Sequence, residues 1–318
     1  MKNKVLTGLL LVLIGGWGSL SAQSAGSNYS RQVNTLIGTK GVGLTSGYLY
    51  PGATYPYGMV QFTPSYFSKR SGFVINQLSG GGCEHMGNFP TFPVKGKLKM
   101  SPDNILNYRI NISEEKGHAG YYEAMVQEDI KAKLTVTERT GMASYEYPAD
   151  QQYGTVIIGG GISATPIEQA AIVITAPNKC EGYAEGGNFC GLRTPYKVYF
   201  VAEFDTDALE SGTWKRNELK PNTTFAEGEY SGVYFTFDVN KKKNIQYKIG
   251  VSYVSVENAR ENLKAENTGW DFLQIQNQAE SKWNHYLGKI EVEGTNPDRT
   301  TQFYTHLYLS LIHISEPT

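Results

Sequence analysis

The sequence lacks the charge surplus and the ligand patterns that several classes of protein need. Lysine and arginine total 29 and aspartate and glutamate total 30, so the formal net charge is -1. Without a basic surplus the chain is poorly suited to a phosphate backbone or an anionic lipid surface, and we expect no nucleic-acid partner. The five histidines have no zinc-ligand spacing and Cys-x-x-Cys is absent, which argues against a zinc site.

Long apolar runs are also missing, and this bears on the N-terminal segment. Lys2 and Lys4 precede an apolar run from Leu9 to Ile14, and small residues follow up to Ala22, as in a secretory signal peptide. A membrane anchor is the alternative, but the run is shorter than the roughly 20 residues that cross a bilayer, and Gly15-Gly16 interrupts it. We predict a signal peptide over residues 1–22 and export to the periplasm or the extracellular space, without stable membrane insertion.

Cysteine is scarce, and the three residues are Cys83, Cys180 and Cys190. An exported chain meets oxidising conditions, and an odd count leaves at least one thiol unpaired. The segment between Cys180 and Cys190 is rich in glycine and short enough to close as a hairpin loop. We therefore predict a Cys180–Cys190 disulfide and a free thiol at Cys83.

Glycine and tyrosine are abundant instead, with 35 and 22 residues, which is typical of twisted sheets joined by many turns. Apolar and polar residues alternate between about residues 90 and 255, which predicts strands with one solvent-facing side. Many short strands separated by turn residues predict a mainly β fold, a large antiparallel β-sandwich over residues 23–255. The predicted strands are 94–100, 121–127, 130–137, 144–147, 155–158, 171–175, 196–204, 233–237 and 246–255.

The apolar period changes near residue 256. Residues 257–266 have the pattern of a short helix, and an apolar residue recurs every four positions from Ile275 to Leu287, as on the buried face of a longer one. We predict a helical linker over residues 256–295. Asn296-Pro297 fits an N-cap followed by a first-turn proline, and a third apolar stripe comprises Phe303, Leu307 and Leu311.

That third stripe has no partner within the chain. We therefore expect residues 296–318 to be the truncated first helix of a further helical domain. Residues 311–318 resemble the translation of a sequencing adapter and are expected to be artefactual.

Two local patterns each have a chemical and a structural interpretation. Residues 159–164 match a dinucleotide-binding fingerprint after a predicted strand, but a β-branched run follows in place of the helix that such a site needs. We interpret them as a glycine-rich strand end. The turn-rich segment Tyr48–Gln61 presents tyrosines that suit a sugar, and a loop packed against a sheet explains it as well.

Asn76–Pro90 contains three consecutive glycines, Gly80 to Gly82. Glycine allows positive φ and close approach of the backbone to a ligand, and the polar side chains around it are Gln77, Ser79, Glu84, His85 and Asn88. A tight loop without a ligand is the alternative. A cysteine-protease pair of Cys83 and His85 is disfavoured, because no third group orients the histidine and no helix terminus lowers the thiol pKa.

Six blocks of sequence now make the reading more specific. They are Val33–Thr39, Tyr50–Ala53, Pro56–Gln61, Leu78–Cys83 with Gly87-Asn88, Tyr196–Val201 and Phe303–Tyr308. In this order they resemble glycoside hydrolase family 92, a family of exo-acting α-mannosidases, and the resemblance runs from about Val33 to Ser310. It implies an N-terminal β-sandwich, linker helices and a C-terminal (α/α)6 barrel, of which this chain has only the truncated start.

The resemblance also implies a reaction. Family members hydrolyse terminal α-mannose from glycans with inversion and with calcium, using one carboxylic acid on the leaving oxygen and one carboxylate on the attacking water. These groups and the calcium site are expected on the barrel beyond residue 318, so we nominate no catalytic residue and no metal ligand in this chain.

The sandwich is expected to contribute substrate-side walls of the sugar pocket. The residues carried over are Pro51, Gly52, Ser79, Gly80, Gly82, Cys83, Gly87 and Asn88. Many members have Thr-His and Gly-Asp where this chain has Asn76-Gln77 and Gly87-Asn88, so the resemblance does not extend to a linkage preference. The competing class is a non-catalytic carbohydrate-binding or surface-adhesion β-sandwich.

Overall fold

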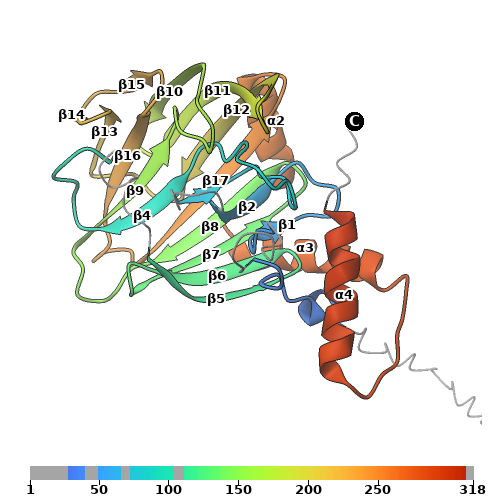
Figure 1. The fold of residues 1–318 in the computed structure, drawn as a ribbon. Helices are drawn as coiled ribbons and strands as arrows, with labels where there is room; N and C mark the ends of the chain where they lie inside the picture. Colours follow the sequence, from blue (N-terminus) through green and yellow to red (C-terminus); the bar gives the residue numbers. More distant parts are fainter. Residues whose placement is uncertain (1–27, 40–48, 66–71, 103–110, 313–318) are drawn as a thin grey trace, which may run out of the picture.

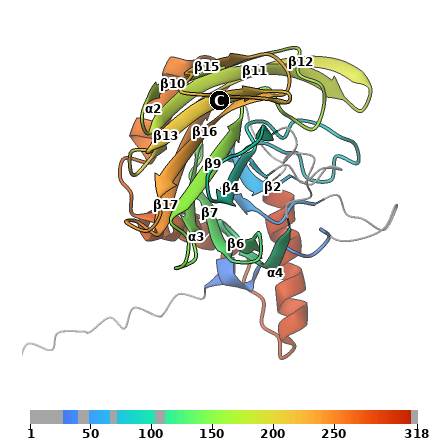
Figure 2. The same ribbon diagram turned by 90° about the vertical axis from the view of Figure 1, so that its left-hand side faces the viewer.

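The computed structural model describes residues 28–39, 49–65, 72–102 and 111–312, and these form two antiparallel sheets packed face to face (Figures 1 and 2). The predicted signal peptide, residues 1–22, lies outside the described residues. The first sheet runs in the order β1 (Ala53–Thr54), β2 (Gln61–Pro64), β3 (Phe73–Val74), β4 (Thr91–Lys95), β9 (Tyr153–Gly159), β16 (Ser231–Asp238), β13 (Glu210–Lys215) and β14 (Glu218–Pro221). The second runs β15 (Phe225–Glu227), β10 (Gln169–Ala176), β11 (Lys179–Phe189), β12 (Leu192–Phe204), β17 (Asn244–Ser252), β8 (Thr140–Glu146), β7 (Ile130–Val136), β6 (Tyr121–Val126) and β5 (Ile112–His118).

Alternating side chains build the core between the sheets, as the period of two predicts. On β6 the buried positions are every second residue, and β10 repeats the pattern. Aromatic rings join the two layers: Phe73 stacks on Tyr145 with ring centroids 6.2 Å apart, and Phe204 lies 5.0 Å from Phe235. The predicted β-sandwich is therefore confirmed.

Two predicted elements differ from the structure. The strand predicted over residues 94–100 ends at Lys95, because Gly96 has a φ of +75° and turns the backbone out of the extended conformation. The segment predicted as a loop between Cys180 and Cys190 is the long strand β11, which pairs with β12 from Lys179↔Glu203 to Phe189↔Leu192. Its glycines permit close packing of neighbouring strands, since a Cβ at Gly182 would stand 2.1 Å from the Ala171 carbonyl and one at Gly187 would stand 2.4 Å from Pro195 Cα. A glycine-rich composition was therefore a poor guide to a loop.

Helices cover the outer face of the nine-stranded sheet. Helix α2 (Val256–Glu266) begins at the N-cap Ser255 and buries Ala259 and Leu263 against Val201 of β12. Helix α3 (Phe272–Leu287) lies over β6, β7 and β8 and buries the predicted stripe from Ile275 to Leu287. None of the described helices is long and apolar enough to span a membrane.

Helix α4 (Pro297–Leu311) stands beside the sandwich, next to α3 and the short 3-10 helix η1 (Tyr29–Gln32) (Figure 1). Asn296 caps it and Pro297 occupies its first turn, as predicted. Its buried side chains are Tyr304, Thr305 and Tyr308, whereas the predicted stripe of Phe303, Leu307 and Leu311 is only half-buried. The stripe is rotated by one residue because α4 docks through Thr305, whose Oγ1 accepts a hydrogen bond from the Asn34 amide at 3.0 Å.

Candidate functional site

The glycine loop, residues Asn76–Asn88, is closed at its base by paired asparagines. The backbone N–H of Asn88 donates to Asn76 Oδ1 at 2.8 Å, and the side-chain Nδ2 of Asn76 donates to Asn88 Oδ1 at 3.0 Å. The hydroxyl of Tyr196, on β12, donates to the same Asn88 Oδ1 at 2.8 Å. Asn76 and Asn88 are fully buried, so these neutral hydrogen bonds fix where the loop leaves the sheet and where it returns.

His85 braces the inside of the loop. Its Nε2 accepts a hydrogen bond from the Leu78 amide at 2.8 Å, so the ring proton is on Nδ1, which donates to the Cys83 carbonyl at 2.7 Å. Burial lowers the pKa of His85, because the charged imidazolium is disfavoured away from water. A neutral histidine therefore ties the start of the loop to its middle.

The disulfide corrects our prediction. Cys83 is bonded to Cys190, and the thiol that remains is the buried Cys180. Cys180 and Cys190 stand near opposite ends of β11, and about 3.3 Å per residue of strand separates them far beyond bonding distance. Cys190 instead lies at the turn between β11 and β12, where it reaches Cys83, and the ring of Phe189 contacts that of His85 at 5.1 Å. The glycine loop is thus fastened to the tip of this hairpin.

The residues expected to face substrate fall into two groups. Gly80 and Gly82 are exposed at the crest of the loop with φ of +73° and +69°, and Ser79 and Cys83 beside them are half-buried. Gly87 and Asn88 are buried at its base. The structure therefore brings together the six predicted residues of the loop, but only its crest is open to solvent.

Pro51 and Gly52 form the second group and are buried. The Pro51 carbonyl accepts a hydrogen bond from Thr35 Oγ1 at 2.7 Å, and the Gly52 amide donates to Thr63 Oγ1 at 3.1 Å. A Cβ at Gly52 would stand 2.3 Å from the Phe62 carbonyl, so glycine permits close packing of two chain segments here. Strand β2 connects the two groups, because Gln61 Oε1 accepts a hydrogen bond from the backbone N–H of Gln77 at 3.3 Å. Contact of Pro51 and Gly52 with substrate stays a prediction.

The tyrosines of Tyr48–Gln61 have different environments. Tyr50 is buried in the core formed with α3 and α4, as the packed-loop interpretation predicts. Tyr55 and Tyr57 are half-buried, and Tyr57 makes an edge contact with Tyr286 of α3 at 5.1 Å. Tyr55 lines an open groove of about 760 Å³ along α3, whose other lining residues are Asp271, Leu273, Gln274, Asn277, Gln278, Ser281, Lys282 and His285.

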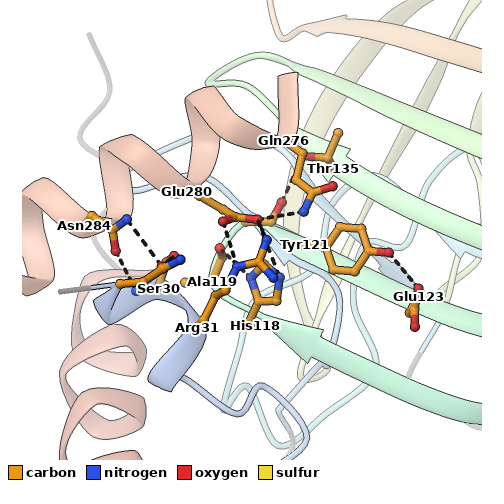
Figure 3. Close-up of polar contacts among 12 residues, drawn as sticks. Ser30, Arg31, His118, Ala119, Tyr121, Glu123, Thr135, Gln276, Glu280 and Asn284 are labelled. Carbon is orange, nitrogen blue, oxygen red and sulfur yellow. Dashed lines mark hydrogen bonds and ion pairs between the residues drawn. The ribbon is translucent and has the colours of Figure 1, made fainter. Parts of the chain in front are cut away.

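An ion pair between the exposed Arg31 and the buried Glu280 holds α3 to the start of the described chain (Figure 3). The carboxylate of Glu280 accepts two hydrogen bonds from the Arg31 guanidinium, both at 3.1 Å, and one from Gln276 Nε2 at 2.6 Å. His118 Nε2 lies 3.6 Å from the same carboxylate, and burial lowers the pKa of this histidine. Because the Glu280 carboxylate accepts hydrogen bonds from both Arg31 and Gln276, we interpret this cluster as a structural contact between η1 and α3. Sequence patterns could not reveal it.

The remaining patterns carry no ligand chemistry. Gly159 ends β9 and the next regular element is the strand β10, so residues 159–164 lack the helix of a dinucleotide site, as interpreted from the sequence. A Cβ at Gly161 would stand 1.9 Å from the Gly228 carbonyl, which explains this glycine by packing. Within residues 28–39, 49–65, 72–102 and 111–312, no three His, Cys, Asp or Glu side chains are grouped as metal ligands.

Comparison with known proteins gives the family. The sequence matches the glycosyl hydrolase family 92 N-terminal domain over residues 32–252 and the catalytic domain of the same family over residues 258–318. The chain belongs to glycosyl hydrolase family 92. A relative from Arthroderma benhamiae, described as an uncharacterized secreted glycosidase, is 25% identical over 89% of this chain and 41% of its own length.

Solved structures of family 92 share the fold. An α-mannosidase from Bacteroides thetaiotaomicron has a TM-score of 0.79 at 24% identity, over 90% of this chain and 41% of its own. An inverting mannosidase from the same organism has a TM-score of 0.76 at 25% identity, over 89% and 39%. The chain therefore spans about two-fifths of the length of these relatives.

Proposed function

We propose that this chain is the N-terminal portion of an exported, calcium-dependent, inverting exo-α-mannosidase that releases terminal mannose from glycans. The observation that carries the proposal is the family match, which includes both the sandwich and the start of the catalytic domain. The relatives support the substrate and the location, since two solved neighbours are mannosidases and the relative from Arthroderma benhamiae is described as secreted. The fold alone would not suffice, because one fold serves many functions.

In this proposal the chain supplies part of the sugar pocket. The exposed crest of the glycine loop presents backbone at Gly80 and Gly82, and a sugar can approach these residues closely because no side chain covers them. The disulfide and His85 hold the two sides of the loop, at Leu78 and Cys83, before substrate arrives, which lowers the entropy lost on binding. The acid, the base and the calcium ligands belong to the catalytic domain in this proposal. The described residues offer no group of three or more His, Cys, Asp or Glu side chains that could bind calcium.

The test is an activity assay with an aryl α-mannoside and calcium, performed on this chain and on a protein that includes a complete catalytic domain. We expect hydrolysis with inverted anomeric configuration by the longer protein and no turnover by the chain alone, because general acid–base catalysis contributes about 10² to 10⁴-fold. Turnover by the purified 318-residue chain would refute our placement of the catalytic groups. A longer protein that binds mannosides without hydrolysing them would support the carbohydrate-binding module instead.

A further inference from the structure

The amide side chain of Gln77 is buried beneath the glycine loop without a hydrogen-bond partner. Gln77 is 1% exposed, and neither its Oε1 nor its Nε2 has a partner among the described residues. The same holds for Asn88 Nδ2 and Ser79 Oγ.

These atoms belong to one place in the fold. A Cβ on Gly87 would lie 3.9 Å from Gln77 Nε2, so the Gln77 amide is beside the residue that precedes Asn88. Ser79 follows two residues after Gln77 on the same arm of the loop. The other polar atom of the Asn88 side chain is engaged, since Oδ1 accepts from both Asn76 and Tyr196. All three side chains therefore belong to the glycine loop, and those of Gln77 and Asn88 are buried at its base.

Unpaired buried amides are unfavourable, and natural structures rarely retain them without a role. Replacement of such a group by an apolar one of the same shape can stabilise a protein, so its retention needs an explanation. Ligand binding supplies one, because a buried polar group that meets its partner only in the complex contributes strongly to specificity.

We propose that Gln77, with Asn88 Nδ2 and Ser79 Oγ, reads the hydroxyl groups of a neutral sugar. This inference rests on the proposed function, and it adds Gln77 as a specificity-determining residue to the substrate-side residues expected from the sequence. A carboxamide offers one acceptor and two donors, which matches a pair of neighbouring hydroxyls, each able to donate and accept. The set carries no charge, so it suits an uncharged sugar rather than a phosphorylated or acidic one.

The loop can give access to these groups. Gly80 and Gly82 stand above them with positive φ, and a Cβ at either position would meet nothing within 4 Å. The disulfide holds Cys83, and His85 ties both Leu78 and Cys83, so the part of the loop without these ties is Ser79 to Gly82. A sugar that displaces this part reaches the amide of Gln77.

The substitution Gln77→Met tests the inference, because methionine has a similar shape and no hydrogen-bonding amide. Without sugar, Tm should rise by about 2–4 °C, since an unpaired polar group is removed. In a protein with a complete catalytic domain, kcat/KM for an aryl α-mannoside should fall by about tenfold, mainly through KM. Gln61→Met is the matched control. Gln61 Nε2 donates to the Gly58 carbonyl and Gln61 Oε1 accepts from the backbone N–H of Gln77, so both polar atoms are paired and the Tm of this variant should fall.

The outcomes separate this inference from the proposed function. A lower Tm for Gln77→Met with unchanged kcat/KM per folded molecule would overturn the inference and leave the mannosidase proposal intact. If the longer wild-type protein does not hydrolyse mannosides, the readout becomes the Tm shift produced by methyl α-mannoside, glucose or galactose. Stabilisation of wild type that is lost in Gln77→Met would then support the inference, and equal responses of the two proteins to all three sugars would overturn it.

Discussion

Removal of the disulfide between Cys83 and Cys190 should destabilise the protein and loosen the glycine loop. The bond joins residues 107 positions apart, and in the chain-entropy model a loop of that size corresponds to about 4–5 kcal/mol. Measured values are often smaller, so we expect the double substitution of Cys83 and Cys190 by alanine to reduce the free energy of unfolding by about 2–4 kcal/mol. At about 2–4 °C per kcal/mol, Tm should fall by roughly 5–15 °C.

The assay is thermal unfolding with and without dithiothreitol, together with peptide mapping under non-reducing conditions. Reductant should lower the Tm of wild type and leave the double-alanine variant unchanged. Cys180→Ala is the control, because it removes a thiol but keeps the disulfide. Burial raises the pKa of the Cys180 thiol, so Cys180 should resist alkylation until the protein is unfolded. A peptide with a Cys180–Cys190 disulfide, or a wild-type Tm that reductant does not change, would refute the reasoning.

Two further predictions concern the same loop. Gly82→Val should cost only about 1–2 kcal/mol of stability, from the positive φ of +69°, because the space around its Cβ is open. If substrate occupies that space, kcat/KM should fall much further, and a loss confined to Tm would remove Gly82 from the pocket wall. Burial lowers the pKa of His85, so below about pH 6.5 the unfolded chain binds a proton that the folded chain excludes. Stability should therefore fall as pH drops from about 6.5. The difference in Tm between pH 7.5 and pH 5.5 should be smaller for His85→Gln than for wild type. Equal differences in the two proteins would count against a buried neutral His85.

Local sequence patterns determined the elements with a regular period. Alternation along β6 and β7 predicted strands with one buried side, and four-residue spacing from Ile275 to Leu287 predicted the face that α3 buries. Asn296-Pro297 fixed the start of α4, since N-cap and first-turn proline act through their own backbone. These features depend on neighbours in sequence, so no tertiary information was needed.

Only the tertiary structure decided which distant residues meet. Cys190 pairs with Cys83 rather than Cys180, because β11 extends in its sheet and carries its two ends apart. Helix α4 buries Tyr304 and Tyr308 instead of the adjacent apolar stripe, because contacts with η1 and α3 set its rotation. The unpaired amide of Gln77 follows the same rule: sequence places a glutamine beside the glycines, but burial and the absence of a partner among the described residues emerge only when the loop folds over it.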